Sequence, residues 1–156
     1  MARINTSIRT GEFNQLVAAS NAMGEKNDCS VKAVALACGA EYEVAHRALA
    51  SNGRRKGRGA YTQDILKAIA DLGFKAERVS IQGFIDQYPK GHRDVLRNVT
   101  THHPARFNNV WADGNTYLMF TKRHVLTVIN GTNHDWTNGR AMRAISVYKI
   151  TKKEEN

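Results

Sequence analysis

Cysteine is scarce in this sequence of 156 residues, with only Cys29 and Cys38 present. The two lie in one predicted helix, and nine steps of about 100° each place them on opposite sides of it. They are therefore not expected to form a disulfide with each other. The lack of a disulfide framework favours a reducing compartment.

Long apolar runs are missing too. No stretch approaches the roughly 20 apolar residues that a membrane-spanning helix needs. The opening residues, MARINTSIRT, lack the apolar core of a signal peptide. We therefore expect a soluble protein of the cytoplasm.

Internal repeats and low-complexity segments are absent as well. The composition, 42% apolar and 24% charged, is that of an ordinary globular protein. A chain of this length suits one domain with a single core. We expect that domain to cover residues 1–156, with its core from about 12 to 150 and a polar tail, TKKEEN, over 151–156.

Acidic residues are in short supply, since 14 stand against 23 basic ones and the net charge is +9. Arg54, Arg55, Lys56 and Arg58 form one basic run. Such a run binds phosphate groups or an acidic protein in some cases and is a solvated loop in others. No aromatic residue interleaves with it, so a platform for stacking bases is not indicated. The run therefore makes nucleic acid or an acidic protein a candidate partner.

Apolar periodicity predicts a helical first half and an extended second half. We expect helices at about 13–23, 29–38, 41–51 and 62–72, the last capped by Thr62, with a basic, Gly-rich turn at 53–59. We expect strands within 74–81 and at 116–122, 124–129 and 144–150, with a further helix in 84–97 and a loop over 98–115. This order indicates an α+β domain whose N-terminal helices pack on a C-terminal antiparallel sheet.

One cysteine stands where a helix begins. In the stretch GEKNDCSVKAVALACG, Cys29 follows Asn27 and Asp28, either of which suits the N-cap, and Gly39 suits the helix end. The N–H groups and partial positive charge of a helix N-terminus lower the pKa of a thiol. Such a thiol is a candidate nucleophile if a base lies near it.

The second half contains a base with an orienting group. Asn130–Gly131 between two extended runs predicts a hairpin with a two-residue type I′ turn. In that register Leu126 is opposite Asp135, so His124 and Asp135 lie on one face as diagonal neighbours. The hairpin therefore predicts an imidazole beside a carboxylate.

Together these residues form a candidate Cys29–His124–Asp135 triad. Cys29 would attack a carbonyl group, His124 would accept and return the proton, and Asp135 would fix the imidazole tautomer. The Cys29 N–H and the Asn27 amide are candidate oxyanion donors, and Trp136 would form a wall of the site.

Each residue also has a structural interpretation. Cys29 could be a small buried apolar residue, Asn27 an ordinary cap and Trp136 a core residue, while Asn133 competes with Asp135 as the orienting group. His102 and His103 lack a neighbouring Cys, Asp or Glu at ligand spacing, so we expect them to be loop residues without a metal.

The segments NDCSVKAVALACGAEYEVAHRAL and RHVLTVINGTNHDWTNG resemble small papain-like cysteine peptidase domains, most closely those of tailed bacteriophages and the bacteriocin-leader peptidases. The resemblance implies a papain-like fold and a cysteine-dependent acyl-transfer enzyme, such as a peptidase, isopeptidase or amidase, without a cofactor. It also implies a phage origin, which would place the protein in the host cytoplasm, and a peptide or protein substrate, which the net charge predicts to be acidic. The family's glutamine before the cysteine is absent from NAMGEKND, so Asn27 or Asn21 would replace it.

Two other functional classes stay open. A non-catalytic basic phage protein of the same fold could bind nucleic acid or an acidic host factor through Arg54, Arg55, Lys56 and Arg58. A virion component could have kept the fold and lost the chemistry.

Overall fold

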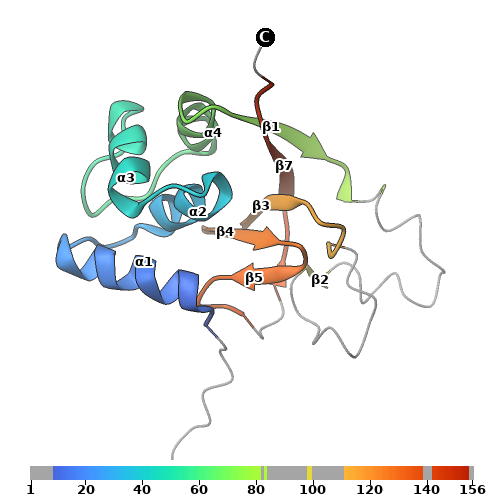
Figure 1. Ribbon diagram of the computed structural model, residues 1–156, viewed down its shortest axis with the longest axis horizontal. Coiled ribbons are helices and arrows are strands. Elements are labelled where there is room, and N and C mark those ends of the chain that lie inside the picture. Colours follow the sequence, from blue (N-terminus) through green and yellow to red (C-terminus); the bar gives the residue numbers. More distant parts are fainter. Residues whose placement is uncertain (1–8, 82, 84–97, 100–110, 139–141, 155–156) are drawn as a thin grey trace, which may run out of the picture.

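Four helices pack on a five-stranded antiparallel sheet in this computed structural model (Figure 1). The structure describes residues 9–81, 83, 98–99, 111–138 and 142–154. The helices are α1 (Gly11–Ala22), α2 (Cys29–Cys38), α3 (Tyr42–Ser51) and α4 (Thr62–Asp71). The strands are β1 (Phe74–Val79), β2 (Asn98–Val99), β3 (Thr116–Thr121), β4 (His124–Ile129), β5 (Thr132–His134), β6 (Met142–Arg143) and β7 (Ser146–Lys152). The predicted α+β class is confirmed.

The large sheet has the strand order β1-β7-β3-β4-β5, and all its neighbours are antiparallel. β7, the last strand of the large sheet in sequence order, lies between β1 and β3. It therefore connects β1, which follows the four helices, to the β3–β4 hairpin. β2 and β6 form a separate two-stranded sheet. The sequence predicted a loop where β2 lies, so this pairing is a correction.

The hairpin that links β4 to β5 has the predicted turn. Ile129 pairs with Thr132, and both Asn130 (φ 46°) and Gly131 (φ 79°) have positive φ. Two consecutive residues with positive φ define the type I′ turn, whose twist matches that of the strands. The turn therefore fixes the register that brings the end of β5 beside the start of β4.

Helix α2 is the central helix of the domain and packs against β4. Seven of its ten residues are buried, and it ends at Gly39 in the left-handed conformation with φ 58°. Its apolar residues join α3, α4 and the facing side chains of Leu118, Val125 and Ile150 in one core. The Thr127 hydroxyl donates to the Ala33 carbonyl at 2.7 Å, which ties the sheet to the helix.

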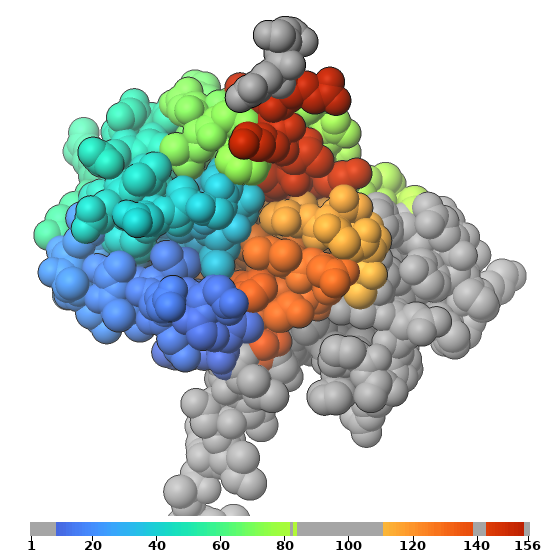
Figure 2. All heavy atoms as spheres, in the orientation of Figure 1, coloured from blue at the N-terminus to red at the C-terminus, as the bar shows by residue number. Residues whose placement is uncertain are grey.

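A second cluster covers the other face of the sheet. It includes Trp111, Tyr117, Met119, Leu126 and Val128. The sheet is therefore covered with apolar contacts on both faces. The space-filling view shows α1 and α2, in blue to cyan, beside β3–β5, in orange (Figure 2).

The predicted cap of α4 differs from the one observed, whereas Asp28 and Gly39 cap α2 as predicted. Tyr61 is the N-cap of α4, and Thr62 is the first residue of that helix. Asp28 is the N-cap of α2, but its side chain makes no capping hydrogen bond. The helix predicted within 84–97 and the histidines at 102 and 103 lie outside the described residues. None of the helices in the described ranges is both long enough and apolar enough to cross a membrane.

Candidate active site

Three elements bring the predicted triad together. Cys29 is the first residue of α2, His124 is the first residue of β4, and Asp135 directly follows β5. His124 Nε2 lies 2.7 Å from Asp135 Oδ2, and the Asp135 side chain is 5% exposed. The hairpin register predicted this proximity from the sequence.

Cys29 contacts the same imidazole from the helix side. The half-buried Cys29 lines the same pocket as His124 and Val125, and hydrogen-bonding interactions with the His124 side chain and the Val125 N–H lower the pKa of its thiol. Because Nε2 of His124 is engaged by Asp135, Nδ1 is the ring nitrogen left for the thiol. The side chains of the three residues are thus connected in one hydrogen-bonded chain.

The electrostatics of this chain favour an ion pair. Burial by itself raises the pKa of the Cys29 thiol, but the hydrogen bonds from His124 and Val125 outweigh burial, so the pKa lies below its ordinary value. Burial would lower the pKa of His124, yet the hydrogen bonds to Asp135 and Cys29 raise it to about 9. Both shifts act in the direction of a thiolate beside an imidazolium.

The second cysteine has the opposite environment. Cys38 at the end of α2 is buried, and burial raises the pKa of its thiol to about 12. Both cysteines are free, as the sequence predicted. Cys38 is therefore an inert internal reference for the reactivity of Cys29.

A second layer of polar residues holds the carboxylate. Asp135 Oδ2 accepts hydrogen bonds from the Thr137 hydroxyl at 2.6 Å and from the Thr137 N–H at 3.3 Å. The Asn133 amide in turn donates to the Thr137 hydroxyl at 3.1 Å. Asn133 was the alternative orienting residue, but its amide binds Thr137. Asp135 is the residue that binds His124. The sequence analysis missed Thr137, although its position two residues after Asp135 is typical of a local side-chain contact.

Trp136 lies against the imidazole. The centroids of the Trp136 and His124 rings are 5.6 Å apart, and Trp136 is 40% exposed to solvent. Trp136 is therefore not a core residue, and it lies against His124 without lining the pocket beside Cys29.

Asn27 is not the N-cap of α2, and its amide binds the basic turn. Its amide donates to the Gly57 carbonyl at 3.0 Å, and its backbone has φ 50°. The neighbouring Asp28 carboxylate accepts hydrogen bonds from Tyr42 at 2.7 Å and from Lys32 at 3.1 Å.

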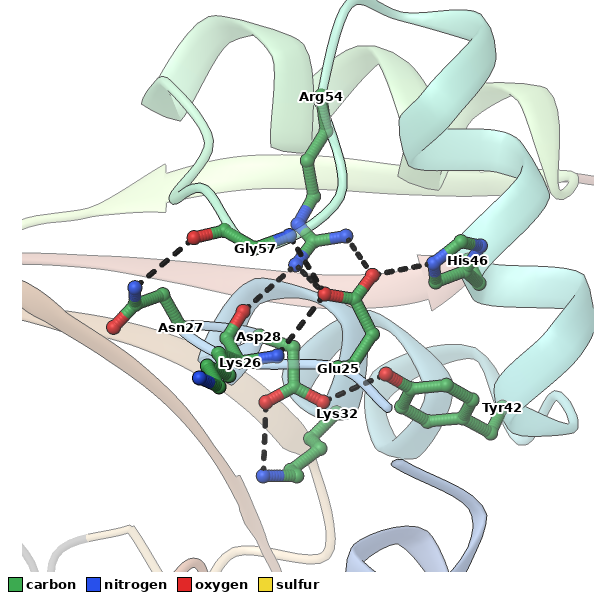
Figure 3. Close-up of polar contacts among 9 residues, drawn as sticks. All are labelled: Glu25, Lys26, Asn27, Asp28, Lys32, Tyr42, His46, Arg54 and Gly57. Carbon is green, nitrogen blue, oxygen red and sulfur yellow. Dashed lines mark hydrogen bonds and ion pairs between the residues drawn. The ribbon is translucent and has the colours of Figure 1, made fainter. Parts of the chain in front are cut away.

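A buried carboxylate joins the segment before α2 to the basic turn (Figure 3). Both oxygens of Glu25 bind the Arg54 guanidinium, at 2.8 and 3.1 Å. The same carboxylate accepts from the Gly57 N–H at 2.8 Å and contacts His46 Nε2 at 2.6 Å. The Arg54 hydrogen bonds outweigh the effect of burial and hold the pKa of Glu25 far below its usual range.

This ion pair corrects the interpretation of the basic run. Arg54 is only 6% exposed and is a structural residue, because its charge is committed to Glu25. Arg55, Lys56 and Arg58 are exposed and remain available to a partner.

A pocket of about 390 Å³ opens beside Cys29 and His124. Its walls come from the start of α2, the end of the basic turn, the start of α4, the end of β3 and the start of β7. The lining residues are Cys29, Ser30, Gly59, Ala60, Thr62, Ile65, Phe120, Thr121, Arg123, His124, Val125, Ile145 and Ser146. The sequence did not indicate the contributions of Phe120 and Ile145, which meet the site only through the pairing of β3 with β7.

Comparisons with protein-family models, with curated proteins and with solved structures found no match to this chain. Among the described residues, no group of three or more His, Cys, Asp or Glu side chains is placed to hold a metal ion. The site is therefore interpreted from its own geometry.

Proposed function

We propose that this protein is a cysteine-dependent acyl-transfer enzyme of the papain-like class, acting as a peptidase, isopeptidase or amidase. The observation that carries the proposal is the hydrogen-bonded chain from Cys29 through His124 to Asp135 beside an open pocket. A cysteine at the start of the central helix and a histidine at the start of a strand support the papain-like class.

The first half of the reaction acylates the enzyme. The Cys29 thiolate attacks the carbonyl carbon of the substrate, and the carbonyl oxygen becomes an oxyanion. The tetrahedral intermediate then expels the leaving group, which takes the proton from the His124 imidazolium. The products are a thioester on Cys29 and a neutral imidazole.

The second half releases the acyl group. Water or an amine attacks the thioester while His124 accepts its proton, and the Cys29 thiolate leaves. Asp135 acts as an orienting residue, because its hydrogen bond fixes the imidazole ring and stabilises the imidazolium in both halves.

The N-terminus of α2 stabilises the oxyanion. No side chain in the described part of the protein caps this helix, so the N–H groups of its first turn, beginning with Cys29, are left for the substrate oxygen. Preorganised backbone donors of this kind are a strong source of transition-state stabilisation. One N–H of the Asn27 amide donates to the Gly57 carbonyl, so we assign the oxyanion role to the backbone N–H groups.

Thiol reactivity tests the proposal directly. Iodoacetamide should alkylate Cys29 well below pH 8 and much faster than Cys38, as located by peptide mass mapping. The His124→Ala variant should move the reactivity of Cys29 to the higher pH of an ordinary thiol. With p-nitrophenyl acetate, the wild type should form an acetyl thioester on Cys29 that Cys29→Ser cannot form. Labelling of Cys29 no faster than that of a free thiol would refute the proposal.

A further inference from the structure

Two more pockets adjoin the one beside Cys29. One, of about 750 Å³, shares Gly59 and Ala60 with it, and another, of about 460 Å³, shares Ile145 and Ser146. Each neighbour thus adjoins the central pocket, which the Cys29 thiol lines. We refer to these three pockets together as the trough.

Basic residues are distributed along the whole trough. Arg55 and Arg58 line one end, Arg123 lines the centre and Arg78 lines the other end. All four are exposed. Within the described ranges no acidic residue lines the trough, and none of these four arginines forms an ion pair. The trough therefore presents positive charge on both sides of the nucleophile.

Exposed apolar side chains alternate with these charges. Tyr61 is 78% exposed and lines the Arg55 end, while Ile145 is 63% exposed and lines both the central pocket and the Arg78 end. Apolar contacts beside separated charges suit a peptide with mixed side chains. The central thiol and imidazole act on a carbonyl carbon, which a peptide supplies and a phosphodiester does not.

The Glu25–Arg54 ion pair decides which residues of the basic run can present their charge to the trough. Glu25 binds the Arg54 guanidinium and the Gly57 N–H, so it fixes both ends of the segment that carries Arg55 (Figure 3). The charge of Arg54 is paired with Glu25 inside the protein. Only the exposed residues of the basic run are therefore left to attract a ligand. A loop that hydrogen bonds already hold in place loses less conformational entropy on ligand binding than a flexible loop does.

From this juxtaposition we propose that the trough binds an extended acidic peptide, whose carboxylates contact Arg55 and Arg58 at one end and Arg78 at the other. The inference rests on the proposed function and names its substrate class. Arg123 lines the central pocket with Cys29 and adds to the electrostatic attraction between the trough and the carboxylates of the peptide. Long-range attraction of this kind speeds association and weakens as salt screens it.

Two matched alkylating peptides test the proposal. The acidic probe is acetyl-Asp-Glu-Ala-Gly-chloromethyl ketone, and the control replaces Asp and Glu with Asn and Gln. In each, the Cys29 thiolate displaces chloride, so a carbon–sulfur bond forms as the carbon–chlorine bond breaks. At low ionic strength the acidic probe should inactivate about fivefold faster, as expected for two exposed ion pairs of modest strength, and the difference should shrink in high salt.

Charge-reversal variants locate the preference. Arg55→Glu with Arg58→Glu should abolish or invert the preference for the acidic probe. The matched control, Arg47→Glu with Lys67→Glu, has the same change in net charge at exposed positions that do not line the trough, and it should keep the preference. Both carboxylates of the probe lie on one side of the carbon that Cys29 attacks, so the assays with Arg78→Glu show which end of the trough that side occupies.

Iodoacetamide, which is small and uncharged, separates the two proposals. Slow labelling of Cys29 by iodoacetamide would overturn the proposed function. Fast labelling with equal rates for the two peptide probes would leave that function intact and overturn the acidic substrate class. Protection of Cys29 by a single-stranded oligodeoxynucleotide, with no acidic-peptide preference, would also overturn it and assign the trough to nucleic acid.

Discussion

His124 Nε2 and Asp135 Oδ2 are 2.7 Å apart, and this hydrogen bond links the start of β4 to the residue that follows β5. The bond exists because the two-residue turn at Asn130–Gly131 sets the register of the hairpin. It leaves the other ring nitrogen of His124 for Cys29. The properties of the site depend on it, and each residue that supports it can be tested separately.

Asp135→Asn should remove the charge that stabilises the imidazolium. The pKa of His124, about 9 in the wild type, should fall towards the ordinary value of about 6.5. NMR titration of the imidazole ring measures this change. Formation of the acetyl thioester should slow by about 100-fold or more, because the ring loses its fixed tautomer. An unchanged titration would show that Asp135 does not control His124.

Thr137→Val should weaken the support of Asp135 without changing the size of the side chain. The substitution removes the 2.6 Å hydrogen bond to Asp135 Oδ2 and the acceptor for the Asn133 amide. We expect acylation about tenfold slower, since a lost hydrogen bond to a charged group costs about 1.5 kcal/mol or more. Thr137→Ser keeps the hydroxyl and should retain most of the activity. Equal loss in both variants would indicate a packing role for Thr137.

Glu25→Gln should destabilise the fold, because it leaves the Arg54 guanidinium buried without its counter-charge. The expected loss in the free energy of unfolding is about 3 kcal/mol, measured by urea denaturation. The double substitution Glu25→Gln with Arg54→Met should recover part of this loss. Glu77→Gln removes a carboxylate from an exposed ion pair with Lys75 and should leave the unfolding midpoint unchanged.

The same carboxylate predicts a dependence of stability on pH. The pKa of Glu25 is far below its usual range in the folded protein, chiefly because of Arg54. Its contribution to stability is therefore fully present above about pH 4.3, the ordinary value for the unfolded chain, and is lost as the pH falls towards the lowered pKa. The wild type should lose stability below about pH 4.3 more steeply than Glu25→Gln. Parallel curves for the two proteins would contradict this assignment.

Asn27→Gly should have little effect on the reaction. The Asn27 amide donates to the Gly57 carbonyl, so its loss should loosen the basic turn without removing an oxyanion donor. Glycine tolerates the positive φ of this position, whereas Asn27→Ala adds backbone strain of about 1 kcal/mol. We expect acylation rates within about threefold of the wild type for Asn27→Gly and a lower unfolding midpoint for Asn27→Ala. A 100-fold slower acylation in both variants, with normal iodoacetamide labelling, would restore Asn27 as an oxyanion donor.

The local patterns of the sequence predicted those parts of the protein that local forces decide. The bounds of α2 followed from the cap position before Cys29 and from Gly39, and those of β4 from its run of strand-forming residues and the following turn. The pairing of His124 with Asp135 followed because a type I′ turn leaves one register for the hairpin.

What the sequence did not reveal depends on contacts between distant segments. The basic run appeared as a single exposed patch because nothing local indicates that Glu25 lies under Arg54. Asn27 was a candidate for the oxyanion role until the basic turn was seen to bind its amide. The trough needs β7 between β1 and β3, and no periodic pattern identifies which strands become neighbours.

The hydrogen bond from Thr127 to the Ala33 carbonyl joins residues 94 positions apart in the chain. Cys29 and His124 are thus far apart in the sequence, and they meet only when the helices have docked on the hairpin. During synthesis on the ribosome, a nascent chain that ends before β4 would carry Cys29 as an unactivated thiol. The reactivity of that sulfur would therefore report when the helices and the hairpin have come together.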